Sequence, residues 1–284
     1  MAYEIGTAAG HYDLLTKLRT FLEVTLPVAE RWAMQWEDTV SADKGVIWKA
    51  PGLSGTEEIY TGIKTYQSVS SDYYNWKING FTGYVPGNSF ETQPGRIAND
   101  IGVPLWNQSI PYWFVGNGQR CIVVAKIENV YESFYLGKFL PYASPSQYPY
   151  PLCVGGMLTS AAGMRYSETT HTAWFKGARA NMAMRFVDGN WRTPQFLPFA
   201  GANTLRNTNS DSNVAEGHYG LHSLVMSENA TGYINNYGEL DGVYFISGFN
   251  NAVENTLIID GVTYVVLRDV WRTGFKDYLA LRLQ

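Results

Sequence analysis

Two histidines four residues apart have a spacing found at metal sites. His218 and His222 lie in the string EGHYGLH, with Glu216 beside them. On a helix, histidines at positions i and i+4 can bind one metal ion. However, Gly217 and Gly220 disfavour a helix here, and no glutamate follows His218 to act as the general base of a zinc protease. We therefore expect a pair of histidines without metal, either on the surface or with their hydrogen bonds satisfied within the protein.

Carboxylate pairs that could hydrolyse a sugar bond are also present. The candidate pairs are Glu128 with Glu132 and Asp260 with Asp269. Such chemistry depends on the distance between two carboxyl groups in space. A chain with 25 acidic residues offers many pairs that are close in sequence, so this spacing carries little information.

No other motif points to catalysis. The chain has no Gly-x-Ser-x-Gly elbow, no phosphate loop ending in Gly-Lys-Ser/Thr, and no Gly-x-Gly-x-x-Gly after a predicted strand. Cys121 and Cys153 each lie in an apolar run, which favours two buried side chains over a disulfide or a nucleophile. His11 is expected at a helix start and His171 in a loop. We expect no catalytic residue and no cofactor, and hence no enzyme.

The composition is low in charge and rich in aromatic residues. Charged residues make up 16% of the 284 residues, against about 25% in an ordinary soluble domain. Aromatic residues make up 15%, and the net charge is −4. This balance gives no basic patch for nucleic acid or an anionic membrane, and there is no apolar run long enough to span a bilayer. Tyrosine and tryptophan suit surfaces that become buried against a partner, although some must line the core.

An uncharged segment in the middle of the chain is the strongest candidate for such a contact. The string FLPYASPSQYPYPLCVGG, residues 139–156, contains four prolines and the three tyrosines Tyr142, Tyr148 and Tyr150. Proline restricts the backbone, so an extended arm of this composition loses little entropy on docking. The alternative is a loop folded back over its own sheet.

Tryptophans provide a second set of candidates. Trp106 and Trp113 are expected, with the three tyrosines, to take part in interactions. Together with Trp174 and Trp191 they also support an alternative function, in which an aromatic face binds cell-surface sugar.

One amphipathic helix is predicted near the N-terminus, over Gly10–Val24. Its apolar residues recur at the helical period, and Asp13 early and Arg19 late have the signs that suit the helix dipole. Pro27 marks the expected end. The start of the chain lacks the layout of a signal peptide, which favours folding in a cytoplasm.

Short β-rich strings dominate the remainder and predict a mainly β (α+β) fold of antiparallel sheets, forming a sandwich or barrel-like core. The clearest hairpin joins Tyr112–Val115 to Cys121–Ile127 through Gly116–Gly118, where glycine tolerates a positive φ. Both strands are apolar on both faces, which predicts a central position, with Ile122 and Val124 on one face and Val123 and Ala125 on the other.

Two lobes are expected, although one continuous domain is the alternative. Residues 1–155 would form the helix and a β-sheet lobe, and residues 156–284 a loop-rich β lobe. Within the second lobe, LIIDGVTYVVLRDV predicts a hairpin turning at Asp260–Gly261, and YLALRL predicts a final strand. The polar string LRNTNSDSNVAEGH predicts a long loop.

Three strings together resemble a family of uncharacterised virion structural proteins of tailed bacteriophages. They are DYYNWKINGFTGY, the run from WNQSIPYWFVGNGQ to YPYPLCVGG, and GELDGVYF with IIDGVTYVVLRDVWRT. The resemblance covers most of residues 1–155 and 238–284, and it brings no catalytic residues. It implies a virion localisation, after synthesis in the host cytoplasm.

The resemblance also implies partners. These would be other virion proteins and copies of the same chain in a symmetric ring, either at the baseplate or at the neck and collar. The alternatives are a receptor-binding or carbohydrate-binding module that contacts a host-surface glycan, or a head-surface protein.

Overall fold

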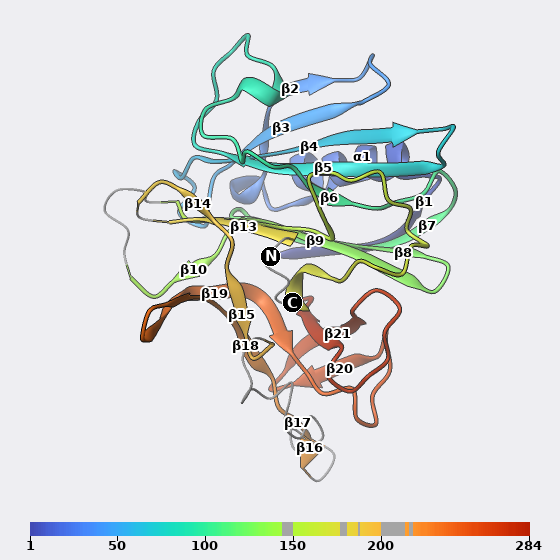
Figure 1. Cartoon of the computed structure of the whole chain (residues 1–284), viewed down its shortest axis with the longest axis vertical. Helices are drawn as coiled ribbons and strands as arrows, with labels where there is room; N and C mark the ends of the chain where they lie inside the picture. Colours follow the sequence, from blue (N-terminus) through green and yellow to red (C-terminus); the bar gives the residue numbers. More distant parts are fainter. Residues whose placement is uncertain (144–149, 177–180, 187, 200–213, 216–217) are drawn as a thin grey trace.

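The computed structural model describes residues 1–143, 150–176, 181–186, 188–199, 214–215 and 218–284. The fold is mainly β, as predicted, with three larger antiparallel sheets and one α-helix among the described residues. The sheets follow one another down the long axis of the molecule (Figure 1). We call them the upper, middle and lower sheets.

The upper sheet is a meander of consecutive strands completed by one later strand. Its strand order is β12-β6-β5-β4-β3-β2. The strands are β2 (Ala33–Asp38), β3 (Gly45–Ala50), β4 (Ile59–Ser68), β5 (Tyr73–Phe81), β6 (Ile101–Val103) and β12 (Leu158–Thr159).

The middle sheet has the order β1-β7-β8-β9-β11-β13-β14. Its strands are β1 (Ala2–Ala8), β7 (Ile110–Gly116), β8 (Arg120–Ile127), β9 (Val130–Lys138), β11 (Leu152–Gly155), β13 (Met182–Arg185) and β14 (Trp191–Arg192). Strand β8 is flanked on both sides, so the predicted central position of the hairpin is confirmed.

The lower sheet has the order β15-β18-β19-β22-β21-β20, and β10 pairs with β19. Its strands are β15 (Gln195–Leu197), β18 (His222–Ala230), β19 (Tyr233–Phe245), β20 (Thr256–Ile259), β21 (Val262–Arg268), β22 (Tyr278–Arg282) and β10 (Leu140–Pro141). A separate pair joins β16 (Val214–Ala215) to β17 (His218–Tyr219).

The predicted helix is present as α1 (His11–Thr20), which continues as a π-helical turn over Phe21–Thr25. Its apolar stripe is buried, and the ring of Phe21 lies 5.7 Å from that of Phe114 on β7. Short 3-10 turns are found at Val28–Glu30, Phe90–Thr92 and Trp174–Lys176. No helix among the described residues is long and apolar enough to cross a membrane.

The β7–β8 hairpin forms as predicted, but its turn works differently. Tyr112 pairs with Ala125 and Val115 with Ile122. No residue from 116 to 118 adopts a positive φ, so that part of the prediction was wrong. Instead, a Cβ on Gly118 would lie 2.3 Å from the Gly52 carbonyl oxygen. The glycine is needed because another backbone approaches it closely.

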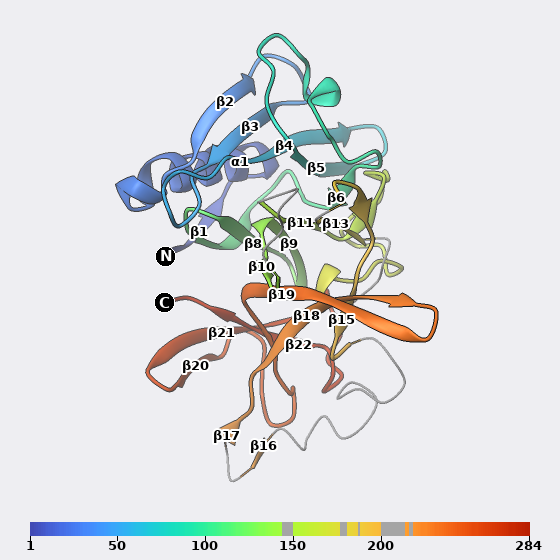
Figure 2. The same cartoon turned by 90° about the vertical axis from the view of Figure 1, so that its left-hand side faces the viewer.

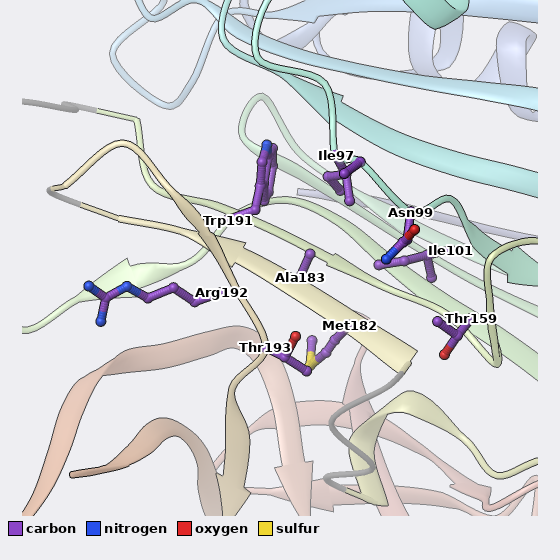
Figure 3. Close-up of a pocket in the computed structure, with 10 residues that line it drawn as sticks. Ile97, Asn99, Ile101, Thr159, Met182, Ala183, Trp191, Arg192 and Thr193 are labelled. Atoms are coloured by element: carbon purple, nitrogen blue, oxygen red, sulfur yellow. The ribbon is translucent and has the colours of Figure 1, made fainter.

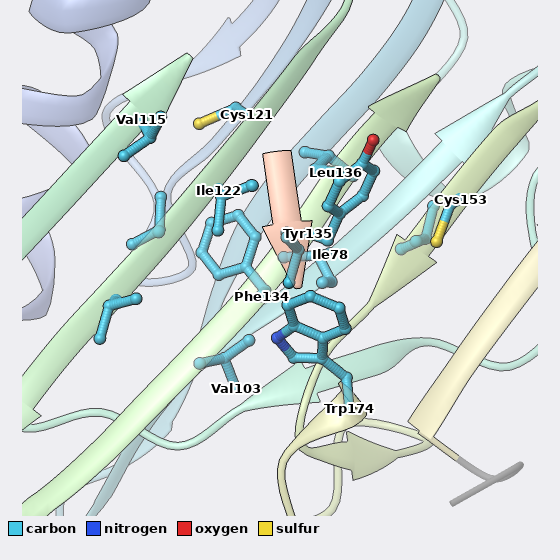
Figure 4. Close-up of a cluster of buried hydrophobic side chains, with 14 of the residues drawn as sticks. Ile78, Val103, Val115, Cys121, Ile122, Phe134, Tyr135, Leu136, Cys153 and Trp174 are labelled. Atoms are coloured by element: carbon cyan, nitrogen blue, oxygen red, sulfur yellow. The ribbon is translucent and has the colours of Figure 1, made fainter. Parts of the chain in front are cut away.

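The two faces of β8 pack against different sheets. Val123 pairs with Phe134, whose ring lies 6.1 Å from that of Trp76 in the upper sheet. Ile122 pairs with Tyr135, whose ring lies 6.0 Å from that of Trp174, on the side of the lower sheet. Figure 4 shows this cluster around Phe134 and Trp174. The middle sheet is therefore covered on both faces.

Strand pairing crosses the lobe boundary expected at residue 155. Strand β12 joins the upper sheet, and β13 and β14 extend the middle sheet. One hydrophobic cluster also runs from Ala8 to Leu283. The arrangement favours one continuous domain, with the change of sheet falling between β14 and β15.

Of the three predictions for the C-terminal region, the hairpin and the final strand are confirmed. The string LRNTNSDSNVAEGH, predicted as a long loop, lies mostly outside the described residues, and its described parts are Val214–Ala215 in β16 and His218 in β17. Ile259 pairs with Val262 across the two-residue turn, in which Asp260 has φ 52° and Gly261 φ 78°. Positive φ at both positions is the signature of a type I′ turn. The final strand, β22, lies between β19 and β21.

Candidate functional site

The uncharged segment after β9 begins by lying along the lower sheet. Phe139 is buried, with its ring 5.7 Å from that of Phe186. Leu140 and Pro141 then pair with β19, and the Tyr142 amide donates to the Tyr237 carbonyl at 3.0 Å. The described start of the segment is therefore folded onto a sheet rather than extended away from it.

The three tyrosines of this segment have different surroundings. Tyr142 remains 57% exposed. Tyr150 is half-buried and packs against the main core cluster. Tyr148 lies outside the described residues. Only Tyr142 therefore presents a described, largely open surface to a partner.

The tryptophans are mostly structural. Trp113 is 7% exposed, because it faces inward from the central hairpin beside Tyr131, and this burial removes it from any contact surface. Trp106 is half-buried, with its ring 5.2 Å from that of Tyr166, and its carbonyl accepts from the His11 amide. Trp174 is buried as well.

The β18–β19 hairpin ends in an exposed apolar tip that the sequence analysis missed. Tyr233 is 63% and Ile234 53% exposed, just beyond a turn in which Gly232 has φ 86°. The hairpin extends from the lower sheet at the left of Figure 1. The alternation in SLVMSENATGYINNYGELDGVYF could have indicated two long strands around a Thr-Gly turn.

A polar cluster holds the base of this tip. Arg192 donates to Glu228 at 2.7 Å and to the Tyr237 hydroxyl at 2.8 Å, and that hydroxyl donates to Glu228 at 2.7 Å. Arg192 also pairs with Asp188. The hydrogen bond from Tyr237, helped by Arg192, lowers the pKa of Glu228. These bonds tie β14 of the middle sheet to the hairpin.

A cavity of about 440 Å³ opens beside the same end of the middle sheet (Figure 3). Trp191, Ile97, Ala183 and Met182 contribute its apolar lining, and Asn99 lies at one side. The Trp191 indole is already fixed by donating to the Gly95 carbonyl at 2.6 Å. The cavity has the size of a small-molecule site.

A buried carboxylate–imidazole pair lies between the middle sheet and the C-terminal region. Glu132 on β9 and His171 are bonded at 2.9 Å, and both are buried. Burial raises the pKa of Glu132, which the bond to His171 partly offsets. Such a pair can orient an imidazole for acid–base chemistry. However, no described hydroxyl or thiol bonds to the other ring nitrogen, so the geometry supplies no nucleophile.

Neither candidate carboxylate pair, Glu128 with Glu132 or Asp260 with Asp269, forms a two-carboxylate site in the structure. Glu128 lies in the β8–β9 turn with φ 55°, whereas Glu132 points into the buried pair. Asp260 lies in a hairpin turn, while Asp269 is buried and accepts from the Ala173 amide at 2.6 Å. The charge of Asp269 instead affects Glu132, because it raises the pKa of that carboxyl group further.

The two histidines of EGHYGLH lie on strands rather than on a helix. His218 is in β17 and His222 in β18. Burial lowers the pKa of His222. Among the described residues, no group of three or more potential ligands could hold a metal ion. Cys121 and Cys153 are free and buried, and burial raises the pKa of both thiols, Cys121 to about 12.

No protein-family model matches this chain, and no curated protein matches its sequence.

Proposed function

We propose that this protein is a non-enzymatic structural subunit of a tailed-bacteriophage particle, located in a tail-associated ring at the baseplate or neck. The resemblance of three sequence strings supports the kind of particle. One structural observation supports the role in assembly: four exposed apolar side chains lie along a single hairpin and the segment paired with it. They are Leu140, Tyr142, Tyr233 and Ile234.

The exposed side chains matter because water is an unfavourable environment for them. Their exposed fractions run from 37% for Leu140 to 63% for Tyr233. A protein with only 16% charged residues has few charges to separate such groups on its surface. Apolar and aromatic groups of this kind supply contact area at protein interfaces.

The support beneath the tip suits a contact between subunits. The Arg192–Glu228–Tyr237 cluster fixes the hairpin to the middle sheet. Because little freedom remains to be lost on docking, a fixed projection binds at lower entropic cost. The partners in this proposal are copies of the same chain and neighbouring virion proteins.

The test is incorporation into virus particles. A phage lacking the gene would be complemented with wild-type protein or with the double variant Tyr233→Ser/Ile234→Ser, and copies per particle measured by quantitative mass spectrometry. The matched control is Ile258→Ser, because Ile258 is 75% exposed on a different hairpin. We expect the tip variant to be depleted at least about tenfold, equivalent to about 1.4 kcal/mol, and the control to be unaffected.

If particles from the complemented phage contain no copies of the wild-type protein, the virion role is refuted. Equal incorporation of all three proteins would refute the role of the tip as a contact. The purified variants should have the melting temperature of the wild type, since Tyr233, Ile234 and Ile258 are all exposed.

A further inference from the structure

Strand β1 forms one edge of the middle sheet and has a partner strand on one side only. Its seven residues, Ala2–Ala8, all pair with β7 in one regular register, and no second described strand pairs with β1. Figure 2 shows β1 at the margin of the middle sheet. An edge strand presents a row of N–H and C=O groups on its outer side, and these groups can pair with another strand.

The main chain at this edge is accessible. Gly6 is only half-buried, and because glycine has no side chain, the surface that it exposes belongs to the main chain. One face of Gly6 is covered, since a Cβ there would lie 2.5 Å from the Tyr112 hydroxyl oxygen. On the other face the side chains of Tyr3, Ile5 and Thr7 are exposed, at 42% for Tyr3 and 55% for Ile5. The edge therefore offers hydrogen-bonding groups together with apolar side chains.

Strand β1 lacks the features that usually protect an open edge from pairing. Such edges are commonly short or bulged, or they carry lysine or proline. β1 contains neither lysine nor proline. Its one charged residue is Glu4, whose carboxylate accepts a hydrogen bond from the Tyr112 hydroxyl at 2.6 Å on the covered face. The exposed face of the strand therefore carries no charge.

The strands at the other ends of the three larger sheets differ from β1. Strand β2, with six residues, has a register shift between Met34 and Trp36 and carries Glu37 and Asp38. The strands at the four remaining ends, β12, β14, β15 and β20, have two to four residues each. Among these sheet ends, β1 is the longest and the most regular.

A second copy of β1 fits this edge in one register better than in its neighbours. When two copies pair antiparallel about a twofold axis perpendicular to the sheet, the residue on the axis faces its own copy. Ile5 is the middle residue of β1, so a register centred on Ile5 pairs the whole strand and places Glu4 opposite Gly6. A register centred on Glu4 would place two carboxylates opposite each other, which is unfavourable. A register centred on Gly6 would leave the first two residues of the strand unpaired.

We propose that two copies of this chain associate antiparallel through β1, with the Ile5 residues of the two copies opposite each other and the two middle sheets joined into one. Main-chain hydrogen bonds supply affinity in this mode of recognition. Tyr3 lies opposite Thr7 of the second copy, and aromatic and β-branched side chains form favourable cross-strand pairs. The inference goes beyond the proposed function, because it uses none of the hairpin-tip residues and does not depend on a phage particle.

Analytical ultracentrifugation of the purified full chain, at concentrations up to about 100 µM, would test this proposal. One pair of strands is smaller than a standard protein interface, so we expect a wild-type dimer with a dissociation constant on the order of 10 µM. Ile5→Lys and Ile5→Glu each place two like charges opposite each other and should raise this constant at least about tenfold. The matched control is Ile258→Lys, at an isoleucine 75% exposed on the edge strand β20, and it should dimerise as the wild type does.

An equimolar mixture of Ile5→Lys and Ile5→Glu tests the register. If the two Ile5 positions face each other, lysine meets glutamate in a mixed dimer, which should form about as readily as the wild-type dimer. Native mass spectrometry would identify the mixed dimer by its mass, and its recovery would also show that both variants are folded.

Three results would overturn the proposal. They are a monomeric wild type at about 100 µM, a dimer that Ile5→Lys leaves unchanged, and a mixture no more dimeric than either variant alone. Loss of the dimer in Tyr233→Ser/Ile234→Ser would overturn it as well, because the contact would then lie at the hairpin tip. Incorporation into particles is a separate measurement, so a failure of the β1 contact would not decide the virion role.

Discussion

The middle sheet packs against the upper and the lower sheet through different kinds of side chain. Between the middle and upper sheets, most of the facing side chains are apolar: Val46, Ile63, Trp76 and Ile78 from above, and Phe114, Val123 and Phe134 from below. The buried polar side chains on these faces are Thr61 and Thr65 of β4, and Glu132, two residues before Phe134 on β9. Between the middle and lower sheets, aromatic contacts such as Trp174 with Phe196 are joined by buried charges.

The principal buried charge on the lower side is Arg120. It is fully buried and contacts the Asp241 carboxylate at 3.1 Å, while Asn117 and Gln119 donate to the same oxygen. Burial alone would raise the pKa of Asp241, but Arg120 and the two amides outweigh it and hold the pKa below its ordinary value.

The difference concerns specificity as well as stability. Apolar surfaces can slide or repack at modest cost, whereas a buried ion pair has one good geometry. We infer that apolar burial holds the upper and middle sheets together, and that the Arg120–Asp241 pair fixes how the lower sheet docks. Four predictions follow from this contrast.

The largest effect is expected from a charge placed in the apolar interface. Val123→Asp would bury an unpaired carboxylate opposite the upper sheet, and we expect a loss of about 5 kcal/mol or more in the free energy of unfolding. Val124→Asp, facing the lower sheet beside Ser133, should cost less. Urea unfolding and the soluble yield would measure both. If both variants keep the wild-type melting temperature, the central position of β8 is wrong.

The next effect is expected from breaking the ion pair. Asp241→Leu would leave the Arg120 guanidinium buried without its partner, at a cost of about 3–5 kcal/mol. The double variant Arg120→Met/Asp241→Leu should recover most of this loss, because no unpaired charge remains. Chemical unfolding of the single and double variants gives the comparison. A double variant as unstable as Asp241→Leu would contradict the assignment.

A pH-dependent effect is expected from His11, on the side of the upper sheet. Its pKa is lowered from 6.5 to about 4, mainly by burial. Between these values the unfolded chain binds a proton that the folded chain does not, so stability decreases as pH falls, by up to about 3 kcal/mol. Unfolding at a series of pH values should show a smaller slope for His11→Phe than for the wild type. Identical slopes would show that folding does not lower the pKa of His11.

The smallest effect is expected from an exposed pair. Lys49 and Glu58 lie 3.4 Å apart, with side chains 36% and 56% exposed. Lys49→Met should change stability by no more than about 0.5 kcal/mol, because water screens both charges. A loss above about 1 kcal/mol would contradict this expectation, since it would show that an exposed ion pair contributes substantially to stability, as the buried Arg120–Asp241 pair does.

Local signals predicted much of the fold. The helix, the β7–β8 hairpin and the Asp260–Gly261 turn each depend on residues close in sequence, so periodicity and turn chemistry sufficed. Strand β1 was missed, although Tyr3, Glu4 and Ile5 alternate between exposed and half-buried positions. Its partner β7 is distant in the chain, and seven residues give a weak pattern.

The candidate sites were harder to predict because they are assembled from distant segments. Glu132 meets His171 from 39 residues away, and Asn117 meets Asp241 from 124. Composition identified aromatic residues as contacts without separating core from surface, so Trp113 and Tyr142 were treated alike although one is buried and the other open. Tertiary packing decides that distinction.

The strand order of the middle sheet has a consequence for how the chain folds during synthesis. Strand β1 starts at Ala2 and β14 ends at Arg192, and the consecutive strands β2 to β6 of the upper sheet are made within that span. The upper meander can pair as it leaves the ribosome, since its contacts are local. The middle sheet is complete only when residue 192 has emerged, so a stalled chain ending before β13 would display an unpaired edge on β11 that invites aggregation.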